Sequence, residues 1–171
     1  MDPKGRRGYV FNTLSDSISV LGLPHVTLVG SIVTEAGPFR GQFNRAGDRL
    51  FVAHRNSSYV VVVNPETQVI ERRVNVGLGV TAMKTDRRTD QVYLARAGAV
   101  DVYDPLSLLP TDAIPLDGTA EFLTIDDERN ALCIAFPDRN EVRLVRIVGK
   151  ETVSRIDVGE RPCEVVLFGG R

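Results

Sequence analysis

The sequence predicts an all-β protein built from copies of one small sheet, and three observations point to this class. First, runs of β-branched residues such as Val60-Val61-Val62-Val63 alternate with polar turns such as Asn64-Pro65-Glu66. Second, the pattern recurs: Tyr9, Phe51 and Tyr93 follow one another at intervals of 42 residues. Third, no helix start signal is followed by apolar residues at a helical period.

The length of the repeat narrows the architecture. The fourth copy, at Cys133, follows Tyr93 of the third copy after 40 residues. A β repeat of about 40 residues is typical of propeller blades, each an antiparallel sheet of four strands. We therefore expect a single β-propeller domain over residues 1–171 with about four four-stranded antiparallel blades. The blades are expected at about residues 8–37, 41–79, 80–118 and 119–161.

Each copy supplies its strands in the same order. The continuous apolar run 60–63 is typical of a strand buried on both faces, as between neighbouring blades. We expect inner strands at 41–44, 81–85 and 121–125, second strands at 8–12, 49–54, 91–96 and 131–136, third strands at 17–21, 59–63, 100–103 and 141–147, and outer strands at 28–33, 69–76, 109–116 and 152–158.

The two ends of the pattern complement each other. The first copy has no inner strand, whereas residues 163–169 read as an inner strand that follows the fourth copy. We expect this segment to complete the first blade, because propellers avoid exposed sheet edges by closure. Three arrangements fit: a closed four-bladed ring, two chains that exchange their last strands in an eight-bladed homodimer, or part of a larger propeller whose upstream blades are missing.

Three stretches share one repeated pattern: Pro3-Lys4-Gly5 with Tyr9-Val10-Phe11-Asn12, Ala46-Gly47-Asp48 with Leu50-Phe51-Val52-Ala53, and Arg155-Ile156-Asp157-Val158-Gly159 with Pro162. The pattern resembles the YVTN-type β-propeller repeat over nearly the whole chain. The resemblance implies a propeller fold, and members of that family usually have seven or eight blades and often lie in the periplasm or at the cell surface of bacteria and archaea. Copies three and four depart from the pattern at Arg96-Ala97 and Phe136-Pro137.

Composition excludes some classes of partner. The net charge of −1 gives no electrostatic reason to expect nucleic acid or an anionic membrane as a partner. No apolar run is long enough to predict a membrane span, and the polar N-terminus has no signal-peptide pattern. Cys133 and Cys163 lie in apolar runs outside any Cys-x-x-Cys pair, so we expect buried small side chains rather than functional thiols.

A candidate binding site follows from the expected topology. Loops that join the second to the third strand, and each blade to the next, should line one mouth of the central channel. Each blade places an arginine near this rim, and guanidinium groups bind carboxylate or phosphate oxygens. Nearby acidic side chains such as Asp138 and Glu160 would neutralise such a ring. The candidate ligand-binding residues are Arg40, His54, Arg55, Arg96, Glu121, Arg139 and Arg161.

The sequence favours a non-enzymatic binding or protein-interaction scaffold. His54 has no carboxylate or nucleophile paired with it by spacing, and His25 is expected at the opposite face, so we expect no catalytic residue and no metal site. No haem or phosphate-loop motif is present, so we expect no cofactor. The partner would be a protein or a small anion. The alternatives are a structural repeat, or a propeller lactonase, lyase or oxidoreductase-associated enzyme acting on a small anionic substrate through Arg40, His54, Arg96 and Glu121.

Overall fold

The computed structural model describes residues 3–167, and these residues form antiparallel strands and one single-turn 3-10 helix, η1 (Pro137–Arg139). Among them, no helix has the length and apolar character needed to cross a membrane. The strands are β1 (Arg7–Asn12), β2 (Ser17–Gly22), β3 (Thr27–Val33), β4 (Pro38–Phe43), β5 (Leu50–His54), β6 (Tyr59–Asn64), β7 (Val69–Asn75), β8 (Ala82–Thr85), β9 (Val92–Tyr103), β10 (Pro110–Thr119), β11 (Phe122–Asp126), β12 (Ala131–Phe136), β13 (Glu141–Arg146) and β14 (Thr152–Asp157).

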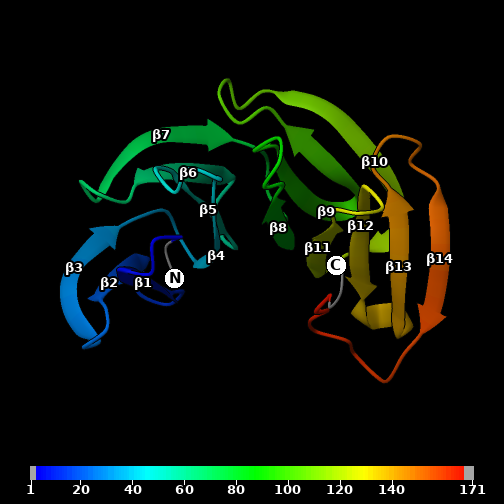
Figure 1. Ribbon diagram of the computed structural model, residues 1–171, viewed down its shortest axis with the longest axis horizontal. Coiled ribbons are helices and arrows are strands. Elements are labelled where there is room, and N and C mark those ends of the chain that lie inside the picture. Colours follow the sequence, from blue (N-terminus) through cyan, green and yellow to red (C-terminus); the bar gives the residue numbers. More distant parts are fainter. Residues whose placement is uncertain (1–2, 168–171) are drawn as a thin grey trace. The chain divides into compact units, whose positions relative to one another are not determined.

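The strands form four antiparallel sheets, each a meander in which strands consecutive in sequence are neighbours (Figure 1). The first sheet has the order β1-β2-β3, the second β4-β5-β6-β7, the third β8-β9-β10 and the fourth β11-β12-β13-β14. This confirms the predicted all-β class with repeated small sheets. The chain divides into two compact units, the first comprising residues up to Val80 with Arg87–Asp90, the second comprising Thr81–Asp86 with the residues from Gln91 onwards.

In the first unit, two sheets pack face to face through alternate strand residues. Ile18, Val20 and Ile32 of the first sheet meet a layer from β5 and β6 of the second sheet. All five residues of β5 and the four valines of β6 are buried, as the apolar run 60–63 predicts. Burying a side chain of this size contributes about 1.5–3 kcal/mol, so this layer is the main source of the unit's stability.

The second unit repeats this packing. Residues of the third sheet, among them Tyr93, Ala95 and Val100, form one buried cluster with alternate residues of the fourth sheet such as Leu132 and Ile134. The opposite face of the fourth sheet carries a second, smaller cluster of Cys133, Ala135 and Val142. Both faces of β12 are therefore buried, and all six of its residues are shielded from water.

The third sheet differs from the prediction in one respect. A single element, β9, spans both strands expected at 91–96 and 100–103. Its ends cannot lie along one straight line, because Arg96 and Asp101 are in direct ionic contact whereas residues five apart in a straight strand are about 16 Å apart. Gly98, at φ 84°, is the residue where the chain can reverse. The element thus bends sharply between Arg96 and Asp101, where the repeat predicts a turn between two strands.

The last described segment carries no strand. Residues 163–167 have no regular structure, and Val165 packs against the Cys133, Ala135 and Val142 cluster of the fourth sheet. An inner strand was expected at residues 163–169, of which Phe168 and Gly169 lie outside the described residues. The closing strand and the blade limits therefore stay predictions.

Candidate functional site

A buried arginine, Arg143, is the centre of a charged network at one end of the fourth sheet. Alternation along β13 places Glu141, Arg143 and Val145 on the same face, so the opposite charges of Glu141 and Arg143 are neighbours. The Arg143 side chain is only 3% exposed. Its Nε and Nη2 donate to the two carboxylate oxygens of Glu141, the second at 3.1 Å, and its guanidinium lies over the Phe136 ring, 4.5 Å from the centroid.

Asp117 extends the network to a second element. This residue lies near the end of β10, and its carboxylate accepts from Nη1 of Arg143 and from Nη1 of Arg139, the latter at 3.0 Å. Hydrogen bonding to Arg143 is the main reason that the pKa of Asp117 falls to about 2. The same guanidinium lowers the pKa of Glu141. Both carboxylates are therefore fully ionised at neutral pH.

The turn that carries Arg139 has a clear local origin. Pro137 opens the 3-10 turn where its missing N–H costs nothing, and Asn140 ends it in the left-handed conformation at φ 54°. The Asn140 side chain accepts a hydrogen bond of 3.0 Å from the backbone N–H of Arg161. Three parts of the second unit are thus joined at one place: the end of β10, the turn between β12 and β13, and the segment after β14.

In the first unit a histidine joins the corresponding connections. His54 is buried, its Nδ1 lies 2.9 Å from the Tyr59 carbonyl oxygen, and its Nε2 lies 2.8 Å from the Thr34 hydroxyl. A carbonyl oxygen only accepts, so Nδ1 carries the proton and Nε2 accepts from Thr34. Burial lowers the pKa of His54, outweighing its bond to Tyr59 and the attraction of Glu35 and Asp16, which raise it. The lowered pKa favours the neutral ring, and the Nε2 lone pair accepts the Thr34 hydroxyl.

Neighbouring contacts fix the same loops. The Asp16 carboxylate accepts from the Gly37 N–H at 2.8 Å, and the Gly37 carbonyl accepts from the Arg55 N–H at 2.8 Å. Gly37 has φ 73°, a conformation that favours glycine. The Arg55 guanidinium lies over the ring of Phe39, 4.7 Å from its centroid. An ion pair of 2.7 Å between Glu35 and Arg73 ties the link to the outer strand β7.

The structure separates the predicted rim residues between the two units. Arg139 and Arg161 meet the turn between β12 and β13 in different ways. The Arg139 side chain bonds the Asp117 carboxylate, and the Arg161 backbone N–H donates to the Asn140 side chain. Arg96 pairs with Asp101 within β9, and Glu121 is exposed while its N–H bonds the Ala135 carbonyl at 3.1 Å. Their role in ligand binding stays a prediction. Arg40, His54 and Arg55 belong to the first unit; Arg96, Glu121, Arg139 and Arg161 belong to the second.

Sequence reasoning missed the carboxylates that neutralise these arginines. Asp117 pairs with Arg139 and Asp101 with Arg96, whereas Asp138 and Glu160 were expected to neutralise the rim. Glu141 pairs with the buried Arg143, which was not a predicted rim residue. Alternation along 141–146 could have placed Glu141 beside Arg143. No local pattern marks Asp117, which lies 26 residues from Arg143 in sequence.

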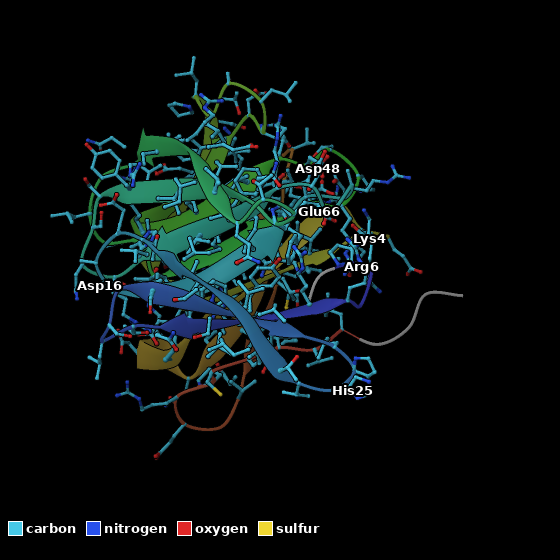
Figure 2. All side chains as sticks on the ribbon, turned by 90° about the vertical axis from the view of Figure 1, so that its left-hand side faces the viewer. Lys4, Arg6, Asp16, His25, Asp48 and Glu66 are labelled. Atoms are coloured by element: carbon cyan, nitrogen blue, oxygen red, sulfur yellow. The ribbon has the colours of Figure 1, made fainter. Side chains whose placement is uncertain are left out.

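The second histidine lies elsewhere in the first unit. Asp16 directly precedes β2 and His25 follows it, and Figure 2 shows the two residues at opposite ends of the first sheet. Because Asp16 is bonded to the link that His54 also contacts, His25 lies at the far end from His54. Among residues 3–167, no group of three or more His, Cys, Asp or Glu side chains is arranged to hold a metal ion.

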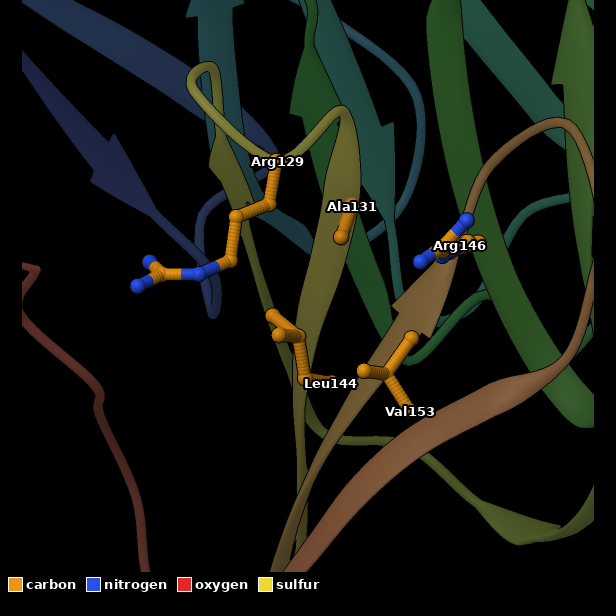
Figure 3. Close-up of a pocket in the computed structure, with 5 residues that line it drawn as sticks. All are labelled: Arg129, Ala131, Leu144, Arg146 and Val153. Atoms are coloured by element: carbon orange, nitrogen blue, oxygen red, sulfur yellow. The ribbon is translucent and has the colours of Figure 1, made fainter.

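A pocket of about 390 Å³ opens on the fourth sheet (Figure 3). Ala131, Leu144 and Val153 form its apolar surface, and Arg129 and Arg146 flank it. Arg129 pairs with Asp126 at 2.7 Å and Arg146 with Glu151 at 3.4 Å. Ala131 lies on the same face of β12 as Cys133, whereas Arg143 is paired with Ile134 on the other face, so the pocket lies on the face opposite to the Arg143 network.

Comparison with solved structures decides the architecture. Hydrazine synthase of Kuenenia stuttgartiensis superposes with a TM-score of 0.82 at 19% identity, over 91% of this chain and 47% of that one. The dihydro-heme d1 dehydrogenase NirN, in complex with DHE, gives a TM-score of 0.71 at 13% identity, over 94% of this chain and 37% of that one. Both are β-propeller folds.

The chain has a β-propeller fold. It spans less than half the length of either similar chain, and at these identities the likeness concerns the fold alone. No protein-family model matches the sequence of this chain, and a comparison with curated proteins finds no match.

Proposed function

We propose that this propeller, with repeats of the YVTN type, is a non-enzymatic scaffold that binds a protein or a small anionic ligand through the loops at the Arg143 and His54 ends of its sheets. The observation that supports the proposal is that the Arg143 and His54 side chains at these ends are bound by neighbouring residues of the same chain. The Arg143 guanidinium is held by Glu141 and Asp117 and stacked on Phe136, and both nitrogens of His54 are bonded.

These contacts support a scaffold because they fix the shape of loops that would otherwise be mobile. A binding surface that is already ordered loses little conformational entropy when a partner arrives. The exposed side chains that such loops present include Arg55, Glu121 and Arg161. Charges of both signs suit a polar protein surface at least as well as a small anion.

The second candidate is a propeller enzyme acting on a small anionic substrate, of the lactonase, lyase or oxidoreductase-associated kind. The two similar structures favour it, because hydrazine synthase and dihydro-heme d1 dehydrogenase are both enzymes by name. In this chain it would require Arg40, Arg96 or Glu121 to face the substrate and His54 to give up a bond to Thr34 or Tyr59.

A paired experiment separates the two functions. Lactones, quinones and small carboxylates would be screened for turnover with the wild-type chain and with His54→Gln, and the immobilised chain would be used to capture protein partners. If the chain is a scaffold, no compound should be turned over. A captured protein partner should bind at least tenfold more weakly to a variant with Glu121→Ala and Arg161→Ala, and equally well to His54→Gln. Saturable turnover that His54→Gln removes would refute it.

A further inference from the structure

One end of the first unit carries a strongly basic surface: we infer that it binds an extended acidic segment of a partner protein. The basic turn surface consists of three successive turns, at residues 3–7, 44–49 and 87–90, and of the hairpin turn at 64–67 beside them. Figure 2 shows Lys4 and Arg6 at the end of the unit away from Asp16. Because Asp16 is bonded to the link that His54 also contacts, this surface is separate from the binding loops proposed above.

Direct contacts within the first unit join the three turns in a row. Pro3 lies against Gly47, where an added Cβ would be 3.0 Å from the proline ring. The Arg45 backbone N–H donates to the Asp90 carboxylate at 2.6 Å. The turn at 44–49 therefore lies between the other two, and the surface is continuous.

Positive charge exceeds negative charge on this surface. Its turns contain seven of the 11 Lys and Arg residues of the first unit, but only three of the unit's seven Asp and Glu residues. One of these carboxylates, Glu66, already pairs with two cations: Arg6, and Arg7 at 3.6 Å. Three carboxylates neutralise at most three of the seven cations, whichever pairs form among them. The net charge of −1 of the whole chain hides this excess, because the second unit contains more acidic than basic residues.

The fold does not require these cations. Arg45 and Arg87 are 42 residues apart and occupy the same position of the repeat. In the fourth copy, which follows the third at an interval of 40 residues, Asp127 takes the place of Arg87. A turn still connects β11 to β12 there. The positive charge is therefore a property of the first three copies rather than a requirement of the architecture.

The composition of the turns favours a protein segment over other anions. They contain no aromatic side chain on which a nucleic-acid base could stack, and no Leu, Ile, Val or Met side chain that could enter a membrane. Six of the seven cations are arginines, whose planar guanidinium groups pair with carboxylates through two hydrogen bonds. The three carboxylates among them disfavour a uniform polyanion and suit a partner in which acidic residues are spaced along the chain.

The packing of the sheets specifies that spacing. The first and second sheets pack face to face, and sheets packed in this way lie about 10 Å apart. The turns at 3–7 and 44–49 precede corresponding strands of these two sheets, β1 and β5. A chain in the polyproline II conformation advances about 3.1 Å per residue with three residues per turn, so every third side chain lies on one side, about 9 Å from the next. The segment that fits therefore has an acidic residue at every third position.

Two labelled peptides of equal composition test the inference by fluorescence anisotropy with the full chain. One contains four Glu-Pro-Pro repeats, and the other contains four Glu followed by eight Pro. We expect the repeat peptide to bind at least threefold more tightly, and its affinity to fall as salt is added. Arg45 and Arg87 are exposed, so Arg45→Glu with Arg87→Glu should leave the chain folded and weaken binding at least tenfold. Lys4→Glu, ahead of the first strand, should weaken it at least threefold.

The matched control reverses two exposed cations of the second unit, Arg146→Glu with Lys150→Glu, which changes the net charge equally and should bind as tightly as the wild type. Circular dichroism checks that each variant is folded. The inference is wrong if neither peptide binds, if the two peptides bind equally, or if both double variants lose affinity equally. It is also wrong if duplex DNA or phosphatidylserine vesicles bind more tightly than the repeat peptide, or if the chain self-associates through Arg45 and Arg87.

Discussion

Replacing Arg143 tests whether the charged network holds the end of the fourth sheet together. In Arg143→Leu, the Glu141 carboxylate stays buried, and the cation that remains paired with it among residues 3–167 is Arg155, whose Nε lies 3.9 Å away. Removing one partner of a buried ion pair costs about 3–5 kcal/mol. The Asp117 side chain is 54% exposed and regains water when it loses Arg143, so the expected loss lies at the lower end, about 3 kcal/mol.

Urea unfolding at pH 7, followed by circular dichroism, measures this change in the free energy of unfolding. The double variant with Arg143→Leu and Glu141→Leu removes both charges and should recover most of the loss, because apolar replacements for a buried pair are often neutral. Arg146→Ala is the matched control: it lies on the same strand but faces the other way, and its exposed pair with Glu151 should contribute about 0.5 kcal/mol. Two results would show that the network does not stabilise this end of the fourth sheet. One is a smaller loss of unfolding free energy in Arg143→Leu than in Arg146→Ala, and the other is a double variant no more stable than Arg143→Leu.

Three further predictions concern other parts of the molecule. Burial lowers the pKa of His54, so below about pH 6.5 the unfolded chain binds a proton at this histidine more readily than the folded chain does. The free energy of unfolding should therefore fall as the pH drops below about 6.5, by up to about 1.4 kcal/mol per pH unit. His54→Gln should remove this dependence in urea unfolding measured at pH 7.5 and 5.5. The pKa of Glu141 is lowered by its hydrogen bonds to Arg143 rather than by burial. The stability that this carboxylate contributes is present above its unfolded pKa near 4.3 and is lost as the pH falls through its folded pKa. Glu141→Gln should therefore weaken the fall of the melting temperature between about pH 5 and 2. A Cβ on Gly41 would lie 2.2 Å from the Phe11 ring, so Gly41→Ala should lower stability by about 1–3 kcal/mol, and adding Phe11→Leu should restore part of it; equal stability of Gly41→Ala and wild type in thermal melting would contradict the packing.

The strands were predictable because their signals are local. Valine-rich runs, polar turns and a repeat near 41 residues are visible along the chain, and they correctly indicate antiparallel sheets of consecutive strands. The bend within β9 also agrees with the repeat, since Gly98 lies between two expected strands. Residues 163–167 differ because an edge segment becomes a strand only when another strand pairs with it, and the sequence does not say which strand that is.

The candidate site was less predictable because burial and long-range pairing decide it. His54 was predicted as a rim residue at a strand end, yet Thr34, 20 residues away, and Tyr59 bond its two ring nitrogens. Arg139 reads as a free rim cation, yet it is paired with Asp117 across 22 residues. Sequence spacing identified the loops correctly but not the contacts between them, which depend on how the sheets stack.

The repeat keeps its backbone while it changes the chemistry that closes each sheet end. Pairing registers place Val61 of the second sheet and Arg143 of the fourth at the same repeat position, opposite Val52 and Ile134 respectively. His54 and Phe136 correspond in the same way: one closes its sheet end by hydrogen bonds, the other by supporting a guanidinium. Since an apolar residue at position 143 would satisfy the fold, as Val61 does, the charged network is not required by the architecture. The binding surface proposed above is therefore expected where the copies differ, at the sheet ends that hold His54 and Arg143, rather than in the strands that they share.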